Sequence, residues 1–407
     1  MLLDISPLRK SKDFRNLFLG QLISSFGTQL TAVVIPFQVY SLTHSSFYTG
    51  VVSGIECLFL LASSLFGGAL ADRCEKRALL LYTEAGLILV PLLLALHAAR
   101  PEPGLTEIMI LAGLASLLMG FHRPALESIT PQLIEPQDLP KVSALAPVRH
   151  ILTTIISPMV GGILISTIGA SLTYMVDCIS FVISMGFLLQ IKKVFPEAHT
   201  VAHVPSFFRE IREGIRYLRT KKIILGSYLS DFIAMVFCNP VSLYPALAEY
   251  MHRPSAIGVF YALPSVGALG ITIFSRWTLH QTRYGRWIIL SGMGWAMSIA
   301  CVGLLGNLYG VWFCLFLAGA FDMVSGIFRL TLWNETIPAS IRGRLAGFEM
   351  LSYTSGPLLG NALLGFLGDK IGIQPALCIG GLVSTSLILL TNLWRPELWQ
   401  FQAPAKQ

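Results

Sequence analysis

Two arginines inside apolar segments are the residues of this sequence best suited to binding an anion. Arg123 and Arg329 each belong to the same irregular pattern, which begins Leu-Ala-Gly and then places Gly, Arg, Leu and Thr. The two copies cover residues 111–136 and 317–342 at a constant offset. A buried arginine is costly in hydrocarbon, so its recurrence predicts two related membrane halves, as in many secondary transporters. A guanidinium fork suits carboxylate or paired oxygen acceptors.

The other ionisable residues in apolar runs extend the candidate site. We expect substrate-binding roles for Arg123, Arg149, Asp231 and Arg329. Asp322 lies near mid-membrane by residue count, where a carboxylate can load and release a proton, so we expect it to be the proton carrier. Glu56 is the second candidate for that role.

Each of these assignments has a structural alternative. Arg123 and Arg329 would then only reach the lipid headgroups. Arg149 and Glu349 would form an ion pair across the two halves. Three more ionisable residues in the apolar runs are interpreted as structural or packing residues: Glu84, His122 and Asp177.

Composition predicts that helices in a membrane position these side chains. Hydrophobic residues make up 54% of the 407 residues and charged residues 13%, against about 25% charged in typical soluble domains. Mean hydropathy is +0.67. We predict an all-α membrane protein with twelve transmembrane helices in two pseudo-symmetric six-helix bundles, residues 1–191 and 223–407. The predicted apolar runs cover 15–41, 47–71, 78–98, 105–129, 142–167, 171–191, 223–248, 255–275, 287–306, 309–334, 345–368 and 372–394.

The distribution of positive charge predicts the orientation. The net charge is +7, and most lysines and arginines fall in the two termini and in alternate loops, so both termini are expected in the cytoplasm and nucleic acid is not an expected partner. The linker 192–222 is basic and amphipathic, which favours a helix lying on the inner membrane surface. A regulatory docking site is the alternative. No cleavable signal peptide is evident.

The loop between the second and third helices carries the most specific motif. It reads Gly68-Ala69-Leu70-Ala71-Asp72-Arg73-Cys74-Glu75-Lys76-Arg77. This resembles the Gly-x-Leu-x-Asp-Arg-x-Gly-Arg-Lys signature of the major facilitator superfamily, with Glu75 where that family prefers glycine. We expect Asp72 to meet the N-terminus of the eleventh helix, near residues 345–346, and to hold the cytoplasmic side shut. The alternative is that these charges only set the topology.

A paired glycine–proline motif resembles that of the superfamily's exporters. Small residues allow close helix approach, and proline bends a helix. The motif residues are Pro158, Gly161, Gly162, Gly356, Pro357 and Gly360.

Within the superfamily, the chain resembles the enterobactin-exporter branch, which adjoins the macrolide-efflux group. The matching segments are Thr43-His44-Ser45, Leu70-Ala71-Asp72-Arg73, residues 156–162 and residues 243–249. The resemblance implies proton-driven export of a small molecule across the inner membrane of a bacterial cell. Combined with the basic residues in the membrane, it predicts an anionic, metal-free siderophore as substrate. Multidrug or macrolide-type efflux is the alternative.

Other classes of function fit the sequence less well. A channel or a membrane sensor would leave the loop signature unexplained. The sequence holds no HExxH, GxSxG or P-loop motif, so we expect neither an enzyme nor an ATP-driven pump. The cysteines are scattered without CxxC spacing, and we expect no cofactor and no metal. The expected partners are protons, the small-molecule substrate and the lipid bilayer, with the chain acting as a monomer.

Overall fold

The computed structural model describes residues 6–192, 216, 221–337, 339–394 and 396–402. Within these ranges the description leaves out a set of side chains, at residues 65, 68–69, 71–73, 136, 139–140, 143–144, 146–148, 150–151, 279 and 339–354. The predicted linker helix therefore lies almost entirely outside the described residues.

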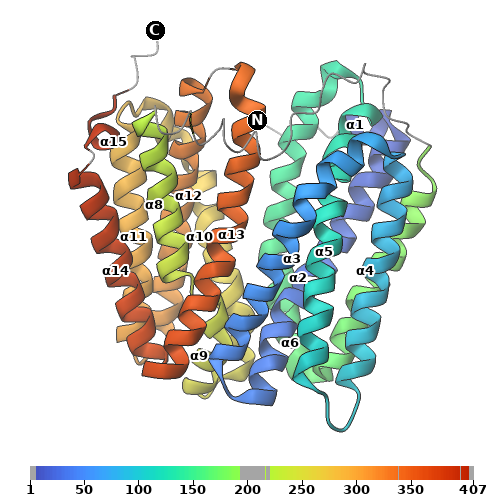
Figure 1. The fold of residues 1–407 in the computed structure, drawn as a ribbon, viewed down its shortest axis with the longest axis horizontal. Helices are drawn as coiled ribbons and strands as arrows, with labels where there is room; N and C mark the ends of the chain where they lie inside the picture. Colours follow the sequence, from blue (N-terminus) through green and yellow to red (C-terminus); the bar gives the residue numbers. More distant parts are fainter. Residues whose placement is uncertain (1–5, 193–215, 217–220, 338, 395, 403–407) are drawn as a thin grey trace. The chain divides into compact units, whose positions relative to one another are not determined.

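Long helices form the first half of the chain (Figure 1). They are α1 (Ser6–Lys10), α2 (Lys12–Thr43), α3 (Ser46–Arg73), α4 (Lys76–Ala98), α5 (Leu105–Ile129) and α6 (Leu139–Leu189), with 3-10 turns η1 (Thr130–Leu133) and η2 (Pro136–Asp138) before α6. The side chain of Ser11 caps α2 by accepting a hydrogen bond from the Phe14 amide at 3.1 Å. Gly169 has a φ of 77°, which only glycine adopts freely, and it divides α6 into two legs.

The second half repeats this pattern with more interruptions. Its helices are α8 (Lys222–Cys238), α9 (Tyr244–Tyr250), α10 (Ile257–Ile273), α11 (Tyr284–Leu304), α12 (Leu308–Thr336), α13 (Ala339–Ile371), α14 (Ile373–Trp394) and α15 (Glu397–Gln400). Short 3-10 turns η3 (Val241–Leu243), η4 (Pro254–Ala256) and η5 (Ser275–His280) lie between them. The predicted run 223–248 is not one helix: it breaks after Cys238, because Pro240 has no amide hydrogen to donate.

The predicted all-α membrane fold is confirmed. In the described part of the chain, ten helices are long and apolar enough to cross a bilayer. Two of the twelve predicted spans are not counted separately among those ten. The two legs of α6 are counted together, and half of the side chains of α13 lie outside the description.

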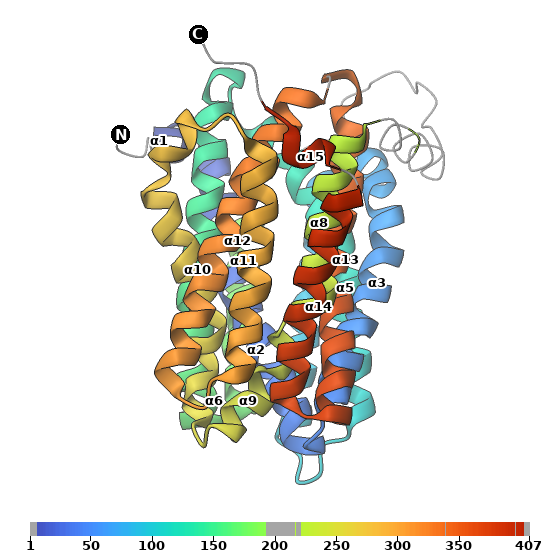
Figure 2. The same cartoon turned by 90° about the vertical axis from the view of Figure 1, so that its left-hand side faces the viewer.

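The chain forms two compact units. Unit 1 comprises Met1–His44, Ile55–Ala202 and Pro254–Ala262, and unit 2 comprises Ser45–Gly54, His203–Arg253 and Leu263–Gln407. In unit 1, α2, α4, α5 and α6 pack around leucines and isoleucines such as Leu80 and Ile129, both 0% exposed. In unit 2, α8 packs against α11, α13 and α14, and α15 lies across the end of this group (Figure 2).

Candidate functional site

The two candidate residues Asp322 and Arg329 share one face of α12. They are seven residues apart, which is about two helical turns. Asp231 on α8 completes the group, because its carboxylate forms an ion pair with the Arg329 guanidinium. The side chains of both partners are only 9% exposed. Asp322 lies within electrostatic reach of both. Unit 2 therefore holds a buried centre of one guanidinium and two carboxyl groups, which we call the acidic centre.

A small cavity adjoins the acidic centre. It lies among α8, α11 and α12, and its lining includes Ser230, Asp231, Ser291, Trp295, Asp322 and Ser325. Its volume of about 10 Å³ is roughly the room that one water molecule needs. Two of the hydroxyls donate to backbone carbonyls of their own helices, Ser230 to Gly226 at 2.9 Å and Ser291 to Trp287. Their oxygens are left as acceptors. The cavity suits a proton or a water molecule and is far too small for a drug-sized ligand.

Aromatic side chains fix α8 against α12 beside the ion pair. The Tyr228 and Trp333 rings stack with centroids 4.4 Å apart, and the Trp333 indole nitrogen donates to the Ser227 hydroxyl at 2.9 Å. Tyr228 and Trp333 lie about one helical turn from Asp231 and Arg329, respectively. The ion pair beside this packing is only 9% exposed, and low exposure to water strengthens the attraction between its charges.

The two arginines in unit 1 have a different environment. Arg123 pairs with Glu127 on its own helix at 3.4 Å, and these side chains are 52% and 65% exposed. Arg149, on α6, is half-buried and lies within electrostatic reach of Arg123. Two guanidinium groups thus lie near each other, with one exposed carboxylate close to them. Such a pair can attract an anion.

The second proton-carrier candidate lies in unit 1. Glu56 is partly buried on α3, within electrostatic reach of the Tyr174 phenol on α6. The Tyr174 hydroxyl itself donates to Gln38 at 2.8 Å. Glu56 therefore has its own local surroundings, in a different unit from Asp322.

His122 is a buried residue whose ring nitrogens both have partners. The Gln21 amide nitrogen lies 3.3 Å from its Nε2, and the Thr83 hydroxyl oxygen lies 3.0 Å from its Nδ1. Thr83 can donate onward to the Leu79 carbonyl at 2.9 Å. A neutral ring with its hydrogen on Nδ1 satisfies all three contacts. The geometry fits the packing interpretation of His122.

The loop motif is described only in part. The side chains of Gly68, Asp72 and Arg73 lie outside the described residues, as do those at 345–346, so the expected latch stays a prediction. Lys76 donates to the Ser128 carbonyl at 3.4 Å, and Arg77 donates to the Leu189 carbonyl at 2.8 Å. Each cation thus meets a helix C-terminus, where the helix dipole favours positive charge.

The glycine–proline motif marks close helix contacts in each unit. In unit 1, a Cβ on Gly162 would lie 2.6 Å from the backbone nitrogen of Gly258, so only glycine fits. In unit 2, a Cβ on Gly360 would lie 2.1 Å from the Met235 carbonyl, and Asn239 donates to the Pro357 carbonyl at 2.9 Å. Arg149's predicted partner Glu349 lies outside the described side chains.

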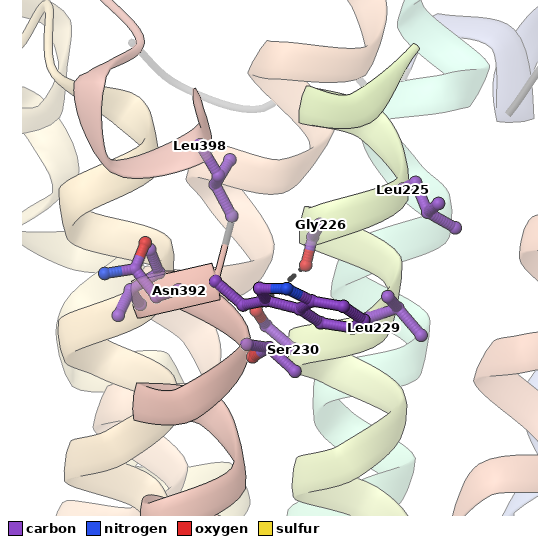
Figure 3. Close-up of a pocket in the computed structure, with 9 residues that line it drawn as sticks. Leu225, Gly226, Leu229, Ser230, Asn392 and Leu398 are labelled. Atoms are coloured by element: carbon purple, nitrogen blue, oxygen red, sulfur yellow. Dashed lines mark hydrogen bonds between the residues drawn. The ribbon is translucent and has the colours of Figure 1, made fainter. Parts of the chain in front are cut away.

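A second cavity, of about 130 Å³, lies beneath the short helix α15 and was not predicted from the sequence (Figure 3). It is lined mainly by apolar groups, and Ser230 borders it as well as the cavity of the acidic centre. Leu398 covers one end and is 3% exposed. Lys222 binds Glu397 at 2.8 Å, and Arg286 lies over the Trp399 ring at 5.3 Å, so α15 is held to α8 and α11. The Glu397-Leu398-Trp399 sequence is too short to give a periodic signal.

The chain matches the family described as transmembrane secretion effectors over residues 4–403. It is 29% identical over 406 residues to a protein of Citrobacter koseri named enterobactin exporter EntS, covering 99% of this chain and 96% of the relative. A protein of the same name from Shigella boydii serotype 18 is 30% identical over 412 residues, covering 100% and 97%.

Solved structures agree on the fold. A crystal structure of the peptide transporter POT in complex with alafosfalin matches with a TM-score of 0.75 at 14% identity, covering 97% of this chain and 96% of that one. A crystal structure of the nucleoside transporter NupG matches with a TM-score of 0.74 at 12% identity, covering 94% and 100%. At such low identity the likeness concerns the fold alone.

Proposed function

Since the chain belongs to the transmembrane secretion effector family of the major facilitator superfamily, we propose that it exports a small anionic molecule of the siderophore class. The direction proposed is from the cytoplasm outward across the bacterial inner membrane, in exchange for protons. Both termini would then face the cytoplasm, as the distribution of lysine and arginine predicts.

Full-length similarity supports the substrate class. The relatives named enterobactin exporters align with nearly the whole of this chain, so the similarity includes both units and not one shared helix pair. Siderophores bind iron through paired oxygens. The arginines of unit 1 offer guanidinium forks of matching geometry, with only Glu127 among the described residues as a nearby carboxylate partner.

The acidic centre is the observation that carries the coupling proposal. Asp231 is already compensated by Arg329, so within the described part of the chain Asp322 has no cation of its own. A second negative charge in a nearly dry site is unfavourable, so Asp322 takes up a proton readily. The adjoining cavity has room for a water molecule that could deliver that proton. Loading and unloading Asp322 would change the charge of the centre by one unit per cycle.

The direct test is transport by the purified full chain in proteoliposomes. Metal-free enterobactin serves as probe and a macrolide as comparison, with counterflow and an imposed proton gradient measured separately. We expect gradient-dependent movement and counterflow of enterobactin. Movement of the macrolide alone would replace the siderophore proposal with drug efflux. Flux without counterflow would indicate a channel, because only a carrier exchanges substrate across a closed gate.

A cellular experiment tests the same proposal without purification. Deleting the gene should remove an iron chelator from the medium of iron-starved cells and leave iron-rich cultures unchanged. A deletion strain with normal chelator secretion but altered antibiotic susceptibility would contradict the siderophore assignment.

A further inference from the structure

A fully buried carboxyl group in unit 1 has no role in the proposed site. Glu84 lies on α4 and is 0% exposed. Neither of its carboxyl oxygens makes a hydrogen bond within normal geometry, and no ion pair to it is found in the described part of the chain. It faces the hydroxyl of Ser184 on α6. A carboxylate in this position would be an uncompensated charge, which costs far more than a neutral carboxylic acid.

Glu84, on α4, lies beside one end of a line of polar residues on α6. Tyr174, Asp177, Ser180 and Ser184 recur at helical spacing and are each at most 5% exposed; we call these four residues the polar stripe. Seven residues separate Asp177 from Ser184, which is roughly 10 Å along the helix.

Helix α2 closes over the polar stripe. A Cβ on Gly27 would lie 2.1 Å from the Ser180 hydroxyl, and one on Gly20 would lie 3.1 Å from the Ser184 hydroxyl. Glycine at both places lets the helix backbones approach until no lipid can enter between them. The polar stripe is therefore an internal feature of unit 1, shielded from the bilayer.

Asp177 is the carboxyl group of the polar stripe, and both of its oxygens have hydrogen-bond donors. Thr31 donates to its Oδ2 at 2.5 Å, and Ser180 lies 3.3 Å from its Oδ1. Glu84 faces a single hydroxyl, that of Ser184. Glu84 therefore has fewer donors than Asp177 to offset a negative charge. A bound proton would remove that charge and leave an O–H to share with the Ser184 oxygen.

The charged groups nearest Glu84 do not neutralise it. On its own helix, Arg77 lies two turns away and donates to the carbonyls of Leu188 and Leu189 at the end of α6. From α5, His122 contacts the neighbouring Thr83, and from α6 the next carboxyl group is Asp177. From α2, Gly20, which lies against Ser184, carries no charge.

We propose that Glu84 is a second proton-binding site of this protein, placed in the core of unit 1 and separate from the acidic centre of unit 2. It binds a proton when protons are abundant and releases it as they become scarce, with the polar stripe as the hydrogen-bonding surface next to it. Its use during transport rests on the proposed function, but proton binding itself does not.

Infrared absorption of the purified full chain tests the proposal without any substrate. The protonated-carboxyl band is recorded from mildly acidic to strongly alkaline pH for the wild type and for Glu84→Gln, which keeps the side-chain size. We expect Glu84→Gln to lose the band of one carboxylic acid per chain, and we expect that lost band to disappear in the wild type as pH rises. Glu102→Gln, in the exposed α4–α5 loop, is the control and should match the wild type.

Three results would overturn the proposal. The first is an identical band in Glu84→Gln and the wild type at neutral pH. The second is a Glu84 band that persists at every pH, since that describes a permanent hydrogen-bond donor. The third is loss of the same band in Asp322→Asn. If Glu84→Gln does not fold, Glu84→Asp should shift the band and its titration midpoint, and an unshifted band would reject the assignment. Failure to transport siderophores would leave all of these measurements unchanged.

Discussion

Arg123 and Arg329 occupy matching places in the sequence repeat, yet their surroundings differ almost completely. Each lies six or seven residues before the end of its helix, α5 or α12. Arg329 is paired with Asp231 and is 9% exposed along its side chain, whereas Arg123 is 52% exposed and pairs with Glu127. The repeat therefore fixes the position of the arginine in its helix. The neighbouring residues decide whether the guanidinium forms a buried ion pair or lies exposed at the surface.

The residues at equivalent positions explain the difference. Four residues after each arginine stands Glu127 in the first half and Trp333 in the second. Trp333 stacks on Tyr228 about one helical turn from the ion pair, while Glu127 is itself 65% exposed and pairs with Arg123 at the surface. Seven residues before Arg329 stands Asp322, and the same place before Arg123 holds Ser116. Under the proposed function, these residues would let the acidic centre of unit 2 hold a proton and let Arg123 in unit 1 attract an anion.

Substitution of Arg329 should have the largest effect on stability and transport. Arg329→Gln leaves the Asp231 carboxylate buried without its cation, which costs about 3–5 kcal/mol in buried pairs of this kind. We expect lower membrane levels, a lower melting temperature in detergent and no transport. The double variant Asp231→Asn with Arg329→Gln should recover most of the stability but not the transport. A double variant no more stable than Arg329→Gln would show that the pair is not coupled.

Asp322→Asn should leave the protein folded but uncouple transport from the proton gradient. The substitution keeps the shape of the protonated acid, so the cavity and the Arg329–Asp231 pair remain. Export measured in proteoliposomes should lose its dependence on the imposed proton gradient, while counterflow persists. Ser325→Ala, which lines the same cavity without a titrating group, is the matched control. The same gradient dependence in Asp322→Asn as in the wild type would refute the assignment.

Arg123→Gln should affect transport without affecting stability. An exposed pair on one helix turn contributes only about 0.3–0.5 kcal/mol, so the melting temperature should hardly change. Export of metal-free enterobactin should fall several-fold, and Arg123→Lys should recover only part of it because lysine lacks the planar fork. Glu127→Gln removes the competing carboxylate and should raise the apparent affinity. Wild-type export by Arg123→Gln would assign anion binding elsewhere.

The sequence was a sound guide to the helices because the membrane imposes length and polarity on every span. The predicted runs at 78–98 and 105–129 agree with α4 and α5 to within two residues. It was a poorer guide at Pro240, where a hydropathy pattern continues through a break in the helix, and at α15, where four residues are too few to give a periodic signal.

The candidate site was predicted as a list of residues and not as a set of neighbours. Hydropathy indicates that Asp231, Asp322 and Arg329 lie in the membrane, but only packing brings α8 and α12 together. Glu84 was interpreted as structural from its place near the inner end of its helix, and the fold buries it against α6. Partner identity depends on helix rotation, which a linear pattern leaves open.

The smallest expected effect contrasts the buried pair of unit 2 with a cluster in unit 1 in which a buried carboxylate meets two exposed lysines. Asp138 accepts a hydrogen bond from Lys10 at 2.9 Å and pairs with Lys141 at 3.0 Å, and these contacts hold the pKa of its carboxyl group below the ordinary value of 3.8. A lowered folded-state pKa stabilises the protein fully above pH 3.8, and the contribution is lost as pH falls through the lowered pKa.

The melting temperature of Asp138→Asn should therefore lie slightly below that of the wild type at neutral pH, and the two should converge in acid. Because Lys10 is 54% exposed, added salt should also narrow the gap, whereas the gap caused by Arg329→Gln should resist salt. A gap for Asp138→Asn that is constant across acid pH would show that the lysines do not stabilise the ionised carboxylate.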